Sequence, residues 1–244
     1  MKKLKSYSAK THQGPLIQIN EDDYDIDLRN QLFMVLDGFG GAGVGDKSVG
    51  LAKSTIKNFF GKICIDPDST LPFFYNPRYL IEGNALINAI KSAHQVLKNE
   101  NAERDMNLRG GVSLIAVAAS EGVMTMVSVG NCLSYLYRRG HLELLTYPDC
   151  LRPLGDDYQQ TLSLHPLSAL GLFDDFEPQV RELRVEADDQ LLLLTDGAFG
   201  RLRREDIEFV LEKKIEKGQI IDDLFQLVNS RGNLDNQTAV ILRF

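Results

Sequence analysis

The chain has 244 residues, 43% of them hydrophobic and 25% charged, with a formal net charge of -7 at pH 7. These proportions are typical of a globular protein with a sizeable core, and the negative charge argues against a nucleic-acid or anionic-membrane surface. Three cysteines without CxxC spacing indicate reduced thiols rather than disulfides or a zinc site. Because neither a signal peptide nor an apolar run of about 18 residues is present, a cytoplasmic protein is expected.

The N-terminal part of the chain predicts strands followed by two helices. Residues 1–13 fit an edge strand or a frayed end, and residues 16–20 alternate apolar and polar as a half-buried strand does. Residues 32–36 form a continuous apolar run of strand length that stops on an aspartate. Apolar residues then recur at helical spacing after Asp46 and again over residues 79–98, so two helices are expected, separated by a proline-rich loop.

The second half of the chain is dominated by short apolar runs. Four runs joined by short turns predict an antiparallel meander, at residues 112–119, 123–129, 133–137 and 142–146. After an irregular excursion at 147–177, we expect strands at 180–185, 190–195 and 238–244 and helices at 204–215 and 220–229. Because strands and helices occur in blocks rather than in alternation, an α+β fold is favoured, as one domain over residues 1–244. A long excursion of this kind is typical of a functional flap.

Acidic residues stand beside several of these predicted strands. Asp37 and Asp196 each follow an apolar run and precede a glycine, while Glu21 and Asp22 lie upstream of the first run and Asp235 precedes the last. Glycine lets the backbone turn sharply and approach whatever the carboxylate holds. Carboxylates that converge repel one another unless a cation lies between them, and hard oxygen ligands suit Mg²⁺ or Mn²⁺. The pattern therefore predicts a divalent-cation site at one end of a sheet.

These segments resemble the motifs of the metal-dependent serine/threonine protein phosphatases, the protein phosphatase 2C family. In family order they are Asn20-Glu21-Asp22, Asp37-Gly38-Phe39-Gly40-Gly41, Gly110-Gly111-Val112-Ser113, Val129-Gly130-Asn131, Leu192-Leu193-Leu194-Thr195-Asp196-Gly197 and Asp235-Asn236-Gln237-Thr238. The resemblance implies a bacterial-like catalytic domain of two packed, mostly antiparallel sheets flanked by helices. It also implies hydrolysis of phosphoserine and phosphothreonine in a phosphorylated protein partner, by water activated at two Mn²⁺ or Mg²⁺ ions and without a covalent phosphoenzyme.

By this resemblance, four positions form the core of the metal site. Asp37 would bridge the two ions, the Gly38 carbonyl would bind one of them, and Asp196 and Asp235 would complete the shell of the other. Many relatives have histidine after the first Asp-Gly, whereas this chain has Phe39. Protonation of the leaving group would then fall to water.

Further positions support this site or depart from the family pattern. Glu21 would act on the metals through water, Asp22 would support the site, and Asn236 would orient Asp235. Asn131 stands where the family usually has an aspartate for a third metal, and an amide without charge would hold that cation weakly. Ile17 replaces the arginine that commonly binds phosphate. These departures leave a second interpretation open, a catalytically weak or inactive module that binds a phosphoprotein or regulatory partner.

Overall fold

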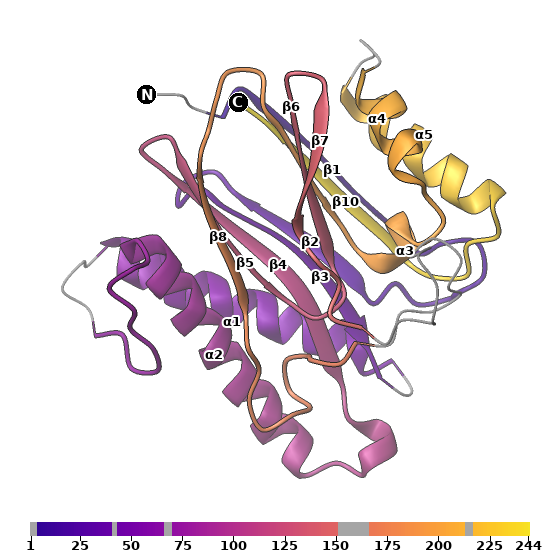
Figure 1. Ribbon diagram of the computed structural model, residues 1–244. Coiled ribbons are helices and arrows are strands. Elements are labelled where there is room, and N and C mark those ends of the chain that lie inside the picture. The colour runs from indigo at the N-terminus through magenta and orange to yellow at the C-terminus, as the bar shows by residue number, and fades with distance from the viewer. Residues whose placement is uncertain (1–3, 41–42, 66–69, 151–165, 213–216) are drawn as a thin grey trace.

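The computed structural model describes residues 4–40, 43–65, 70–150, 166–212 and 217–244. Its strands form two five-stranded antiparallel sheets that pack face to face (Figure 1). One sheet has the order β1 (Ser6–His12), β10 (Gln237–Arg243), β9 (Gln190–Leu194), β6 (Leu133–Arg138) and β7 (His141–Thr146). The other has the order β2 (Asp22–Asp27), β3 (Leu32–Phe39), β4 (Gly111–Ser120), β5 (Val123–Val129) and β8 (Gln179–Arg184).

Helices cover the outer faces of both sheets, which gives four layers. Figure 1 shows α1 (Gly45–Ile65) and α2 (Ile81–Ala102) across the β2–β8 sheet, and α4 (Arg204–Glu212) and α5 (Lys217–Ser230) beside the other. Two short helices complete the structure: η1 (Met106–Leu108) precedes β4, and α3 (Asp196–Phe199) follows β9. The expected α+β fold is confirmed. Among the described helices, none is both long and apolar enough to cross a bilayer.

The core has three parts because each sheet is buried on both faces. On β3, Phe33 and Val35 pack between the sheets, while Leu36 joins the core beneath α1 and α2. The third part lies between the β1–β7 sheet and helices α4 and α5, and includes Leu192 and Ile207. Burial on both faces explains why β3 and β9 appear in the sequence as continuous apolar runs rather than as alternating ones.

The strand predicted at residues 16–20 is wrong: these residues form a loop, and the strand begins at Asp22. In β2, Tyr24 and Ile26 pack against the core between the sheets, whereas the alternate positions are aspartates that face α1. Asp25, for example, pairs with Lys57 of α1 at 3.0 Å. The lysines that pair with this acidic face lie in α1, far away in the sequence. The strand could therefore not be recognised from its own residues.

The predicted four-stranded meander is also wrong at its centre. β4–β5 and β6–β7 are antiparallel hairpins, but β5 and β6 belong to different sheets. Gly130 has φ +88°, and the chain there crosses from one sheet to the other instead of folding back. A glycine-containing connection permits either course, so local sequence did not distinguish them.

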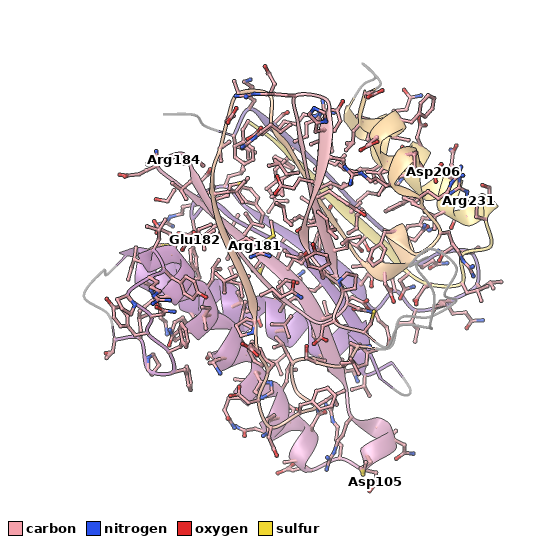
Figure 2. All side chains as sticks on the ribbon, in the orientation of Figure 1. Asp105, Arg181, Glu182, Arg184, Asp206 and Arg231 are labelled. Atoms are coloured by element: carbon pink, nitrogen blue, oxygen red, sulfur yellow. The ribbon has the colours of Figure 1, made fainter. Side chains whose placement is uncertain are left out.

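The excursion at 147–177 is described only at its two ends, since residues 151–165 lie outside the described residues. Its second half returns to the sheet, where the backbone of Leu170 exchanges hydrogen bonds with Val112 at 2.9 and 3.2 Å. It leads into the edge strand β8, whose Arg181, Glu182 and Arg184 are labelled in Figure 2. Charges on an edge strand discourage pairing with another chain. Helix α4 ends at Glu212, and residues 213–215 of the predicted helix lie outside the described part of the chain.

Candidate metal centre

Asp22 and Asp37 lie opposite each other on neighbouring strands. They are register partners in the antiparallel β2–β3 pair, an arrangement that brings side chains on the same face close together. Asp37 was expected just beyond its strand, but β3 continues to Phe39 and places it inside the ladder. Both aspartates are buried, at 6% and 9% exposure. Two acidic groups are thus held side by side with little access to solvent.

Asp196, the first residue of α3, joins this pair from the other sheet. The carboxyl groups of Asp37 and Asp196 are hydrogen-bonded to each other, and Asn131 Nδ2 donates to Asp196 Oδ2 at 3.0 Å. Burial raises the pKa of Asp37 well above its usual range, and the charges of Asp196, Asp22 and Asp235 raise it further. Carboxylates that converge to bind a cation are expected to repel one another in this way when only the charges of the protein are considered.

Thr195 ties Asp22 to the end of β9. Its hydroxyl donates to Asp22 Oδ2 at 2.7 Å and accepts from the Thr238 backbone N–H at 2.9 Å. Burial is the main reason that the pKa of Asp22 is raised well above its ordinary value, and the charges of Asp196 and Asp235 add to it, although the hydroxyl contacts oppose the rise. Thr195 was missed at the sequence level; its signal is a polar residue directly between a buried strand and an acidic residue.

Asp235 enters from the loop that precedes β10. Its Oδ1 accepts from the Asn236 backbone N–H at 2.8 Å, and its own backbone N–H and C=O are bound by Asn233. Burial raises the pKa of Asp235. A Cβ at Gly197 would lie 1.8 Å from the Asn236 carbonyl oxygen, so glycine after Asp196 is required for α3 to reach this loop. We call Asp22, Asp37, Asp196 and Asp235 the carboxylate cluster.

Glu21 lies at the edge of this cluster and fastens α1 to it. Its Oε1 accepts from the backbone N–H of Gly45 at 3.1 Å, and its carbonyl accepts from the Gly38 N–H at 3.1 Å. Burial raises the pKa of Glu21, the Gly45 contact lowers it, and the charge of Asp235 is among those that raise it. Asn236 orients this region mainly through its side chain, whose Oδ1 accepts from the Glu21 N–H at 2.9 Å.

The donor chemistry of the carboxylate cluster fits Mg²⁺ or Mn²⁺. The neighbouring charges that raise the pKa values of Asp22 and Asp37 are carboxylates, and carboxylate oxygens are the hard ligands that these cations prefer. Within the described residues, no three His, Cys, Asp or Glu side chains are arranged to hold a metal ion by themselves. A cation here would therefore take further ligands from backbone oxygens and waters, as Mg²⁺ commonly does.

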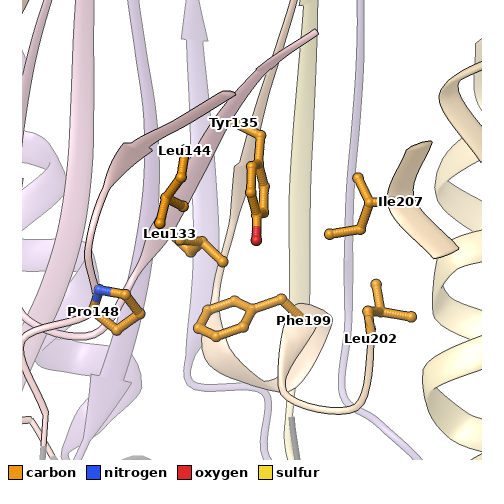
Figure 3. A pocket seen from close by; sticks show the side chains of 7 residues that line it. All are labelled: Leu133, Tyr135, Leu144, Pro148, Phe199, Leu202 and Ile207. Carbon is orange, nitrogen blue, oxygen red and sulfur yellow. The ribbon is translucent and has the colours of Figure 1, made fainter. Parts of the chain in front are cut away.

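A separate pocket lies near α3 and has different chemistry. Figure 3 shows its lining, which is Leu133, Tyr135, Leu144, Pro148, Phe199, Leu202 and Ile207, around a cavity of about 50 Å³. No acidic or basic side chain is among these residues. The cavity is therefore suited to neither a cation nor a phosphate, and the carboxylate cluster remains the candidate site.

Comparisons with known proteins agree with this picture. A family model described as Protein phosphatase 2C matches residues 17–241. A Streptococcus pyogenes serotype M6 protein, provisionally named as protein phosphatase 2C-type, is 24% identical over 166 residues, which are 64% of this chain and 67% of the relative.

Two solved structures show the same fold. The PPM Ser-Thr phosphatase MsPP of Mycobacterium smegmatis, in complex with cacodylate, has 23% identity and a TM-score of 0.80 over 99% of both chains. The catalytic domain of the serine threonine protein phosphatase PstP, in complex with two manganese ions, has 21% identity and a TM-score of 0.78 over 98% of this chain and 97% of that one.

Proposed function

The chain belongs to the protein phosphatase 2C family, and from this premise we propose that it hydrolyses phosphoserine and phosphothreonine in proteins with the help of Mn²⁺ or Mg²⁺. The observation that carries the proposal is the carboxylate cluster, in which acidic groups from four separate segments meet in a largely buried place. We further propose that residues 1–244 act as a single catalytic domain with a flap-like excursion around 147–177.

Within this proposal the cluster residues hold two divalent cations. Such a pair supplies an acidified water and positive charge for the phosphate oxygens. Asp37, which lies opposite Asp22 and beside Asp196, would be a ligand of both ions, and the Gly38 carbonyl would bind one of them. Asp196 and Asp235 would hold the second ion. Their role is positioning and charge compensation, which account for most of the catalysis in phosphoryl transfer.

The remaining residues of the proposed site keep these ligands in place. Asp22 is fixed by the Thr195 hydroxyl, and Glu21 is fixed at the start of α1, where it would act through water. The position after the first Asp-Gly gives no proton donor, because Phe39 is apolar. Its ring packs closely against Gly111, where an added Cβ would lie 2.6 Å from the ring. The leaving group would take its proton from water.

A second candidate function is a phosphatase-fold module that binds a phosphoprotein without efficient hydrolysis. The observation that favours it is Ile17, a half-buried aliphatic residue in the loop before β2, at the position where the family commonly has a phosphate-binding arginine. An aliphatic side chain cannot replace the bidentate hydrogen bonds of a guanidinium.

Hydrolysis of p-nitrophenyl phosphate and of phosphothreonine peptides, with Mn²⁺, Mg²⁺ or EDTA, tests the two candidates. We expect turnover only with an added cation, and Asp37→Ala and Asp196→Ala should each abolish it. Asp23→Ala is the matched control, since Asp23 follows Asp22 on β2 but pairs with Lys53 of α1, and it should remain active. A folded protein that binds Mn²⁺ yet hydrolyses none of several phosphopeptides would support the binding module instead.

A further inference from the structure

Asn131 is buried beside the carboxylate cluster and is held firmly there. It is 2% exposed and follows Gly130 in the crossover between the sheets. A Cβ at Gly130 would lie 2.2 Å from Ser113 Oγ, so this turn is pressed directly onto β4. The Gly130 carbonyl also accepts from the Asp149 N–H at 2.9 Å. The crossover is therefore anchored on both sides, and the Asn131 side chain has little freedom to move.

The contact between Asn131 and Asp196 is a donor–acceptor pair. Asn131 Nδ2 donates a hydrogen bond to Asp196 Oδ2 at 3.0 Å, and an amide offers hydrogen-bond donors only at its nitrogen. The amide nitrogen rather than the amide oxygen must therefore face Asp196. On its other side, Asp196 contacts the carboxyl group of Asp37. The amide thus adds the positive end of a dipole to a place otherwise surrounded by negative groups.

We propose that Asn131 is a positioning residue, whose amide holds the carboxylate of Asp196 within the cluster and makes the site one for two divalent cations rather than three. The inference rests on the proposed function, because it concerns the same site. An aspartate at this position would be a fifth carboxylate next to Asp37 and Asp196, and it would need a further cation to offset the repulsion. The neutral amide gives the same packing without that need.

Mn²⁺ binding to the full chain, measured by isothermal titration calorimetry after EDTA treatment and dialysis, tests this proposal without relying on turnover. We expect two equivalents of Mn²⁺ for the unmodified chain. Asn131→Ala should still bind two, but with about 10-fold weaker affinity for at least one, which is typical of losing a residue that orients a ligand. Asn131→Asp should gain a third equivalent, and its melting temperature should fall in EDTA and recover with Mn²⁺.

Asn88→Ala is the matched control, because Asn88 is equally buried but binds the 73–74 backbone from α2. It should lose stability while keeping two Mn²⁺ equivalents of unchanged affinity. Three equivalents in the unmodified chain that become two in Asn131→Ala would make Asn131 a ligand and overturn the proposal, as would unchanged affinity in Asn131→Ala. A chain that binds two Mn²⁺ but does not hydrolyse phosphopeptides would refute the proposed function and leave the role of Asn131 intact. A chain that binds no Mn²⁺ would refute both the proposed function and the role of Asn131.

Discussion

Replacing Asp37 by asparagine should stabilise the metal-free protein while it destroys the metal site. Asp37 is buried, and three carboxylates raise its pKa, so its negative charge opposes folding whenever no cation is present. Asparagine has the same shape and can still donate to Asp196, but it removes the charge. The usual view that a buried site residue is needed for stability predicts the opposite result.

The expected gain follows from the charges around Asp37. Pairs of unit charges in contact repel by on the order of 4 kcal/mol at an effective dielectric constant of about 20. Because the pKa of Asp37 is raised by burial and by its neighbours, protonation relieves part of this repulsion, and a net gain of about 2 kcal/mol is expected. For a chain of this length, that corresponds to a rise in melting temperature of about 4–8 °C.

Urea unfolding and thermal melting in EDTA at pH 7.5 measure this gain, and the same experiments with Mn²⁺ measure the loss of the site. Unmodified protein should be strongly stabilised by Mn²⁺, whereas Asp37→Asn should respond weakly or not at all. Asp23→Asn is the control, because it removes an equal charge that is paired with Lys53; it should lose up to about 1 kcal/mol and keep the Mn²⁺ response. If Asp37→Asn is less stable than the unmodified chain in EDTA, the repulsion argument is refuted.

Three further substitutions test other contacts. Thr195→Val removes the hydroxyl that donates to Asp22 and should cost about 1–3 kcal/mol in urea unfolding; a neutral effect would show that the contact does not matter. Asp206 forms a two-point ion pair with Arg231 (Figure 2), which lowers the pKa of Asp206 from 3.8 to about 2. The stabilisation from this ion pair is therefore complete above pH 3.8 and is lost as the pH falls towards 2. Asp206→Asn should lower the free energy of unfolding by about 1 kcal/mol at pH 7, after allowance for solvent screening, and by less at pH 3. The same loss at both pH values would contradict this. Gln237 is fully buried, and both polar atoms of its side chain have no hydrogen-bond partner among the described residues, so Gln237→Met should raise stability by about 1–2 kcal/mol. Thermal melting measures this change, and a lower melting temperature in Gln237→Met would instead indicate a buried water that satisfies the amide.

The elements that were predicted well are those whose pattern is local. The apolar run at 32–36 became the centre of β3, and the spacing after Asp46 became α1. In contrast, residues 16–20 alternate like a strand yet form a loop, while the acidic β2 was missed. The acidic face of β2 makes sense only beside the lysines of α1, about 30 residues away in the sequence.

The candidate site shows the same division. Its acidic residues could be selected from their Asp-Gly contexts and from the family resemblance. Their partners could not, because the Thr195–Asp22 contact spans 173 residues and the Asn131–Asp196 contact spans 65. Nothing in the residues next to Asn131 specifies that its amide will donate to the aspartate at the start of α3.

The sequence by itself determined the α+β class, the buried strands, most of the helices and the identity of the acidic residues, because periodicity and turn chemistry act over a few residues. Only the tertiary structure decided that β5 and β6 belong to different sheets, that Asp37 lies inside a strand opposite Asp22, and that Asn131 binds Asp196. These features depend on packing the two sheets and their flanking helices at the same time. The free energy that selects them is shared among distant segments rather than encoded in any one of them.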